Sequence, residues 1–137
     1  MDKLTAVVAL LVITTTTITT AMAYPFLISE RGTNHTQNKE LVYSIPEKYF
    51  NFVDTIEFKP DYAYCRAYGD FEQKKCYSGR SYVKWDVYHN CYNGIIILSN
   101  PKYLIHELGH IYEHCELKRN ISTEEFANNF KVTSSLP

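Results

Sequence analysis

The segment LIHELGHIYEHC, residues 104–115, contains the pattern His106-Glu107-x-x-His110. Positions four apart share one face of an α-helix, so both imidazoles can reach a single metal ion. Glu107 lies beside the first histidine, where it can take a proton from a water molecule that the metal activates. The segment therefore predicts a helix that carries a catalytic Zn²⁺ site, with Glu107 as the general base.

A catalytic zinc site needs a third protein ligand. His114 lies about 12 Å along the helix axis from His106, at about 1.5 Å per residue, so an unbroken helix cannot bring both to one ion. Cys115 is half a turn out of phase with the two histidines and suits a disulfide better. Farther along the chain, Glu124 and Glu125 are the remaining candidates.

The pattern Ser122-x-x-Glu125 predicts a capping box that opens a final helix, residues 122 to about 131. In a capping box the glutamate reaches back to the cap, which would leave Glu124 free to face inward. We therefore favour Glu124 as the third ligand, with Glu125 and His114 as alternatives.

The pattern His106-Glu-Leu-Gly-His110-x-x-x-His114, followed by Glu124-x-x-Ala127-Asn128-x-Phe130, resembles the ImmA/IrrE-type zinc metallopeptidases over roughly residues 92–130. The resemblance implies a zincin-like domain that hydrolyses peptide bonds, with Glu124 as the third ligand. It implies that Asn128 orients a ligand histidine, as residues behind metal ligands commonly do. It also suggests that the strand at 94–98 pairs with an extended peptide or protein substrate. His114 is expected behind the ligands or beside Glu113.

The rest of the chain predicts an α+β fold. Residues 24–40 are polar and aperiodic, which indicates an extended lead-in, and 41–137 then form one zincin-like domain. Asn100-Pro101 supplies a cap and a first-turn proline for the helix that carries the histidines. A small antiparallel sheet is predicted from five segments rich in β-branched and aromatic residues, at 41–45, 52–58, 62–66, 81–88 and 92–99.

Residues 1–23 have the composition of a secretory signal peptide, with a charged start, an apolar run at 6–13 and the close Ala21-Met22-Ala23. Cleavage is predicted before Tyr24, which makes the protein secreted and extracellular. A retained membrane tether through residues 4–23 is the alternative, although the threonine-rich second half weakens it.

The cysteines also indicate export. An even number in a small exported chain is typical of disulfides, and we expect the pairs Cys65–Cys76 and Cys91–Cys115. Asn34 and Asn120 begin glycosylation sequons. The net charge of −1 argues against a nucleic-acid partner.

Two functions follow from these patterns. The first is a secreted zinc metallopeptidase, in which Glu107 passes the proton of the attacking water to the leaving amine. His89 and several tyrosines are candidates for stabilising the oxyanion. The alternative is an exported, disulfide-stabilised binding protein that keeps a structural or otherwise non-catalytic zinc.

Overall fold

The computed structural model describes residues 24–68 and 73–133. The predicted signal peptide or membrane tether, residues 1–23, lies outside this part of the chain. No helix in the described part has the length and apolarity needed to cross a membrane. The described elements are a mixture of strands and helices, which confirms the α+β class.

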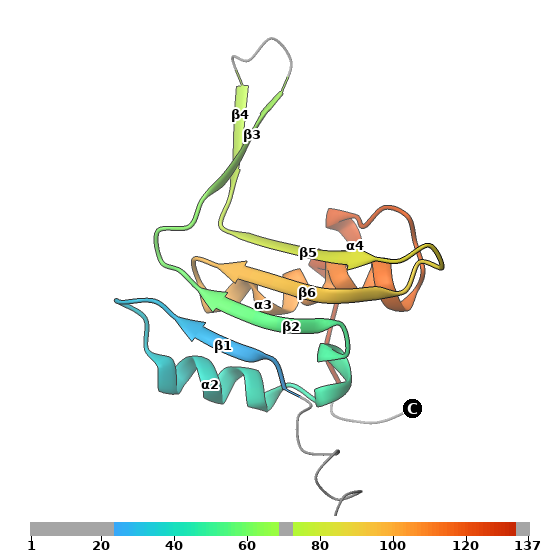
Figure 1. Cartoon of the computed structure of the whole chain (residues 1–137). Coiled ribbons are helices and arrows are strands. Elements are labelled where there is room, and N and C mark those ends of the chain that lie inside the picture. The colour runs from blue at the N-terminus through green and yellow to red at the C-terminus, as the bar shows by residue number, and fades with distance from the viewer. Residues whose placement is uncertain (1–23, 69–72, 134–137) are drawn as a thin grey trace, which may run out of the picture.

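A mixed four-stranded sheet forms the centre of the molecule (Figure 1). Its strand order is β1 (Phe26–Ser29), β2 (Val53–Phe58), β6 (Cys91–Leu98) and β5 (Gly79–Trp85). The pairs β1–β2 and β2–β6 are parallel, and β5–β6 is antiparallel. The predicted antiparallel sheet is therefore wrong for two of these pairings, and it is right for β5–β6.

The position of β6 also corrects the expected substrate strand. Residues 94–98 pair with β2 on one side and with β5 on the other, so both of their edges are already hydrogen-bonded. The edge that stays available for a further strand on this side of the sheet belongs to β5.

Helix α2 (His35–Ser44) replaces the predicted strand at 41–45 and the end of the predicted lead-in. The lead-in also contains β1, which is extended as predicted, so the extended assignment is wrong only at 35–40, where α2 begins. The side chain of Asn34 caps α2 by accepting the N–H of Gln37 at 3.1 Å. Parallel neighbouring strands need a crossover connection, and α2 with the following 3₁₀ turn, Glu47–Phe50, provides it between β1 and β2.

The other predicted strands are confirmed with shifted ends. The segment predicted at 81–88 ends at Trp85, because the Asp86 carboxylate accepts the N–H groups of Tyr88 at 2.8 Å and Asn90 at 3.0 Å and so forms a turn. The strand predicted at 62–66 is β3 (Tyr64–Tyr68), and it pairs with an unpredicted strand, β4 (Gln73–Tyr77). Together β3 and β4 form a hairpin that projects from the sheet (Figure 1).

The core lies between one face of the sheet and the helices. Ile56 and Ile96, from neighbouring parallel strands, are fully buried, and Val42 of α2 belongs to the same apolar cluster. Helix α3 (Leu104–Ile111) contributes Leu104 and Leu108 to that cluster. It follows a 3₁₀ turn, Pro101–Tyr103, in which Asn100 caps the N–H of Lys102 as predicted. His106 and His110 are not among the buried residues of α3 and lie on its other face.

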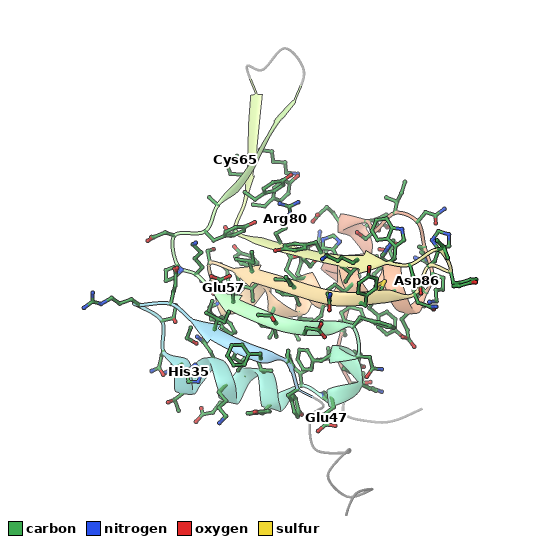
Figure 2. All side chains as sticks on the ribbon, in the orientation of Figure 1. His35, Glu47, Glu57, Cys65, Arg80 and Asp86 are labelled. Carbon is green, nitrogen blue, oxygen red and sulfur yellow. A yellow bond between two sulfur atoms is a disulfide. The ribbon has the colours of Figure 1, made fainter. Side chains whose placement is uncertain are left out.

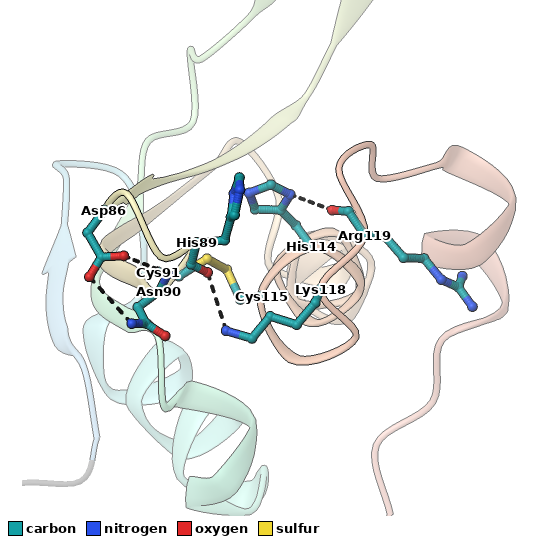
Figure 3. The surroundings of a disulfide bond; sticks show 8 residues. All are labelled: Asp86, His89, Asn90, Cys91, His114, Cys115, Lys118 and Arg119. Carbon is teal, nitrogen blue, oxygen red and sulfur yellow. Dashed lines mark hydrogen bonds between the residues drawn. A yellow bond between two sulfur atoms is a disulfide. The ribbon is translucent and has the colours of Figure 1, made fainter.

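Both predicted disulfides are confirmed. Cys65–Cys76 joins β3 to β4 across the projecting hairpin. Cys91–Cys115 joins the start of β6 to the π-helical turn Tyr112–Glu116 that continues α3 (Figure 3). Cys115 is fully buried, so the second bridge fixes the end of the histidine helix to the sheet from inside the core.

Replacing Cys91 and Cys115 together by serine is expected to lower the free energy of unfolding by about 3 kcal/mol, because the bridge closes a loop of 24 residues and lies in the core. The matched double variant at Cys65 and Cys76 should cost less, because that hairpin stands away from the core. Urea unfolding of both variants measures the difference. An equal or larger loss from the hairpin variant would contradict this ranking.

Candidate metal centre

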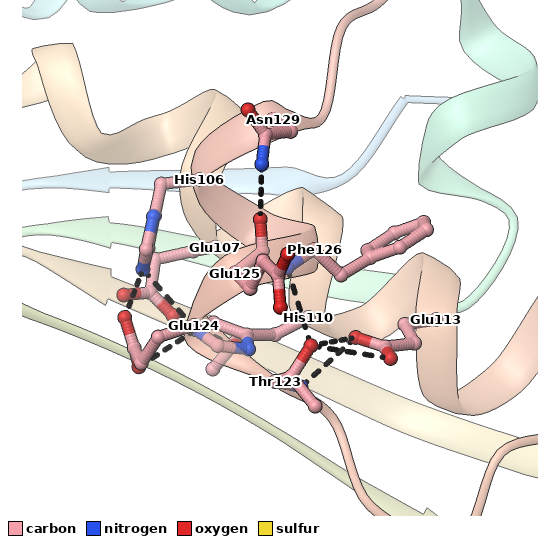
Figure 4. Close-up of polar contacts among 10 residues, drawn as sticks. His106, Glu107, His110, Glu113, Thr123, Glu124, Glu125, Phe126 and Asn129 are labelled. Atoms are coloured by element: carbon pink, nitrogen blue, oxygen red, sulfur yellow. Dashed lines mark hydrogen bonds and ion pairs between the residues drawn. The ribbon is translucent and has the colours of Figure 1, made fainter.

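His106 and His110 lie one turn apart on α3, and Glu124 is the first residue of α4 (Glu124–Asn129). Nε2 of His106 lies 3.1 Å from Oε2 of Glu124, and Nε2 of His110 lies 3.2 Å from Oε1 of the same carboxylate (Figure 4). The two Nε2 atoms are 3.1 Å apart. Three side chains from two helices therefore bring their donor atoms to one point.

This donor set fits a small divalent cation. In a tetrahedral zinc site with bonds of about 2 Å, neighbouring donor atoms lie about 3.3 Å apart. The three separations described here, 3.1, 3.1 and 3.2 Å, are close to that spacing. Two imidazoles and a carboxylate are also the residue types found at catalytic zinc sites. The predicted group His106, His110 and Glu124 can thus hold a metal ion.

The cap of α4 is Thr123, one residue later than predicted. Its hydroxyl accepts the N–H of Phe126 at 3.2 Å, which places Glu124 at the first helical position. The predicted capping box of Ser122 with Glu125 is therefore wrong. Glu124 nonetheless faces the histidines, whereas Glu125 is exposed and does not belong to the metal-binding group.

A buried glutamate that sequence reasoning did not assign holds this cap in place. Glu113 is 2% exposed, and its carboxylate accepts the Thr123 N–H at 2.9 Å and an Arg119 N–H at 3.1 Å. Burial alone would raise the pKa of Glu113, but these hydrogen bonds outweigh it and hold the pKa below its usual value. The charged carboxylate of Glu113 is therefore the form that holds the segment between Arg119 and Thr123. Its contribution to the free energy of unfolding is lost as the pH falls through this lowered pKa.

A close helix crossing sets the distance between α3 and α4. A β-carbon on Gly109 would lie 2.9 Å from Cβ of Phe130 and 3.0 Å from the Cα of Ala127. Gly109 is thus the position at which the two backbones approach each other. Ala127, which is 2% exposed, fills the other side of the crossing with a single methyl group. Small residues at both positions let Glu124 reach the histidines.

Glu107 lies beside the donor atoms but points toward β5. Its carboxylate accepts the hydroxyl of Ser81 at 2.8 Å, and the residue is 6% exposed. A β-carbon on Gly79 would lie 2.9 Å from Oε1 of Glu107, so the glycine leaves room for the carboxylate. Burial raises the pKa of Glu107, and the Ser81 hydrogen bond with the nearby His110 and His106 offsets part of the rise. Neither Ser81 nor Gly79 carries a motif that could have marked it in the sequence.

The donor atoms and Glu107 open onto one cleft of about 840 Å³. Helix α3 and the start of α4 form one side of it, and β5 with the hairpin strands forms the other. Four tyrosines line it and stay candidates for oxyanion stabilisation, Tyr64, Tyr77, Tyr82 and Tyr103. His89, the other candidate, is not among the lining residues. It lies in the β5–β6 turn, where its carbonyl accepts Lys118 Nζ at 3.3 Å (Figure 3).

Two further residues, His114 and Asn128, were predicted to lie behind the metal ligands. His114 does not belong to the metal-binding group, since its Nδ1 bonds the carbonyl of Arg119 at 2.8 Å and its ring packs on Trp85. Asn128 lines the cleft, but Nδ1 of His110 is buried without a hydrogen-bond partner in the described part of the chain. The role of Asn128 as a partner of a ligand histidine stays a prediction.

Asn34 and Asn120 are exposed, and their glycosylation also stays a prediction.

In comparisons with protein-family models, with curated proteins and with solved structures, this chain has no match. The resemblance to ImmA/IrrE-type metallopeptidases therefore rests on the motif residues alone.

Replacing Gly109 by alanine is expected to displace α4, because the added methyl group would meet the Ala127 backbone. Overpacking of this kind costs about 1 to 3 kcal/mol in the free energy of unfolding, and zinc affinity should fall with it because Glu124 moves. Unfolding curves and a zinc titration measure both effects. The control is Asn129→Ala, on the exposed side of α4. A Gly109→Ala protein that binds zinc as the wild type does would contradict the role of the crossing.

Proposed function

We propose that this protein is a small zincin-like metallopeptidase that binds Zn²⁺ through His106, His110 and Glu124. One observation carries the proposal: three donor atoms within 4.8 Å of one another lie in an open cleft beside the buried carboxylate of Glu107. A cluster that served only to hold the two helices together would not need a second, separately supported carboxylate at that place.

A zinc ion held by these residues supplies a Lewis acid, which polarises a peptide carbonyl and lowers the pKa of a water molecule. Glu107 is the proton carrier of the reaction. It accepts a proton as the water attacks the carbonyl carbon, and it delivers that proton to the nitrogen of the leaving amine. The Ser81 hydroxyl donates a hydrogen bond to Oε2 of Glu107, and this bond keeps the Glu107 side chain oriented toward β5.

The substrate of the proposed reaction is an extended peptide. β5 is one of the two edge strands of the four-stranded sheet, and it forms one wall of the cleft. An extended chain can add to such an edge through backbone hydrogen bonds, without requiring a particular sequence. This placement would bring a peptide bond past Ser81 and Glu107.

The proposed place of action is outside the cytoplasm. Both disulfides favour an oxidising compartment, in which such bonds form and persist. The predicted leader at residues 1–23 agrees with export, with a retained tether as the alternative.

A structural zinc in a binding protein is the second candidate, and the small size of α4 favours it. That helix has six residues, of which only Ala127 is buried. A metal that joined Glu124 to the two histidines would therefore add much to its stability. The two candidates differ in what Glu107 does, since only an enzyme needs it.

Glu124→Ala removes a metal ligand itself. Losing a residue that only supports a ligand lowers metal affinity by about 10- to 100-fold, so zinc affinity should fall by more than this in Glu124→Ala. Glu125→Ala is the matched control, since it changes the neighbouring exposed glutamate. Metal content and zinc titration of both purified variants measure the effect. Near-stoichiometric zinc in Glu124→Ala would remove Glu124 from the ligand set.

Glu107→Gln is expected to abolish peptide hydrolysis while zinc stays bound, because the amide keeps the side-chain shape but cannot carry the proton. His106→Ala should lose both zinc and activity. Turnover of a general peptide substrate and metal content are measured on the same preparations. A purely structural zinc predicts that wild type and Glu107→Gln are equally inactive and that His106→Ala loses stability.

A further inference from the structure

We propose that the cleft selects peptides with a glutamate or aspartate side chain near the cleaved bond, which Arg80, Lys75 and Lys102 bind. The inference rests on the proposed peptidase function and adds a substrate class to it. It comes from the charges that line the cleft rather than from the metal-binding residues.

The cations of the cleft lack anionic partners within the described chain. Arg80, Lys75 and Lys102 line the cleft. Among the described residues that line it, the acidic ones are Glu107 and Glu124, which face Ser81 and the histidines. Within residues 24–68 and 73–133, none of these three cations takes part in an ion pair. Among the described residues, a substrate carboxylate would therefore compensate positive charge that a neutral peptide would leave unpaired once solvent is removed.

Tyrosine rings hold the cations in place without neutralising them. The Arg80 guanidinium lies 4.2 Å from the ring centroid of Tyr64 and 5.4 Å from that of Tyr82. Nζ of Lys102 lies 4.9 Å from the Tyr103 centroid, and Nζ of Lys75 lies 5.3 Å from that of Tyr77. A cation over a ring face keeps its charge and its N–H donors. Each therefore keeps its positive charge toward an anion, at a reduced cost in side-chain freedom. Arg80 also has a side-chain hydrogen bond with Tyr62, and its guanidinium carries further N–H donors.

Among the three cations, Arg80 is the best placed to bind a substrate carboxylate. It lies where the hairpin meets the sheet (Figure 2), between Gly79, which leaves room for the Glu107 carboxylate, and Ser81, which bonds it. Neighbouring residues of a strand point to opposite faces, so Arg80 points away from Glu107, and it also lines the cleft. A peptide on the edge of β5 would have its backbone near the metal-binding residues and one side chain near the guanidinium. The planar fork of arginine matches a carboxylate with two parallel hydrogen bonds.

The experiment uses matched fluorogenic peptides that differ only by Glu or Gln at each position flanking the cleaved bond. The wild-type protein with zinc should cleave the best Glu peptide about tenfold faster, in kcat/KM, than its Gln counterpart, because a charged hydrogen-bonded pair is lost in the amide. The ratio should fall as salt is raised. Arg80→Gln should bring it close to one, and Arg80→Lys should leave an intermediate ratio because the fork is lost but the charge is kept.

Lys84→Gln is the matched control, since Lys84 is exposed on the same strand and does not line the cleft. It should keep the wild-type ratio, and zinc content confirms that each variant is folded. Equal cleavage of Glu and Gln peptides by the wild type would overturn the inference and leave the peptidase proposal standing. So would an unchanged ratio in Arg80→Gln.

Binding separates the two proposals if no peptide is cleaved. Fluorescence anisotropy of the same peptides on the zinc-loaded Glu107→Gln protein should show tighter binding of the Glu peptide. A preference for the Glu peptide without any turnover in the wild type would support the acidic selectivity and overturn the peptidase function. The absence of both binding and cleavage would overturn both.

Discussion

The close approach of α3 and α4 at Gly109 and Ala127 is the constraint on which the candidate site depends. The two histidines share α3, so their mutual position follows from helix geometry alone. Glu124 belongs to another helix, and only the crossing brings its carboxylate within about 3 Å of both rings. A larger residue at either position would separate the helices and leave two histidines without a third donor.

Several weaker restraints act on the chain segment between α3 and α4. The Cys91–Cys115 bridge fixes the π-helical turn that ends the histidine helix. From that turn, Glu113 bonds the backbone of Thr123, and Thr123 in turn caps α4. The chain between the helices is thus held at both ends by buried groups. Together these restraints explain how a helix of only six residues can present Glu124 in a defined direction.

The sequence predicted the local features of this molecule well. Both disulfide pairs, the Asn100 cap, the histidine helix and four strand segments were confirmed, because each depends on residues that lie close together in the sequence or carry distinctive chemistry. The prediction failed at α2, where only Asn38 and Val42 are buried and the apolar pattern is therefore faint. Asn34 was interpreted as a sequon, although it also caps that helix. The parallel pairing was missed together with the crossover.

The sequence by itself determined that two histidines share a helical face and that Glu107 lies beside them, since a repeat of 3.6 residues per turn fixes both. Only the tertiary structure decided that Glu124 reaches them, that Ser81 supports Glu107, and that Arg80 lines the same cleft. The physical reason is that these contacts join segments far apart in the chain. Their distances are set by how helices and strands pack, and no local pattern of residues encodes that packing.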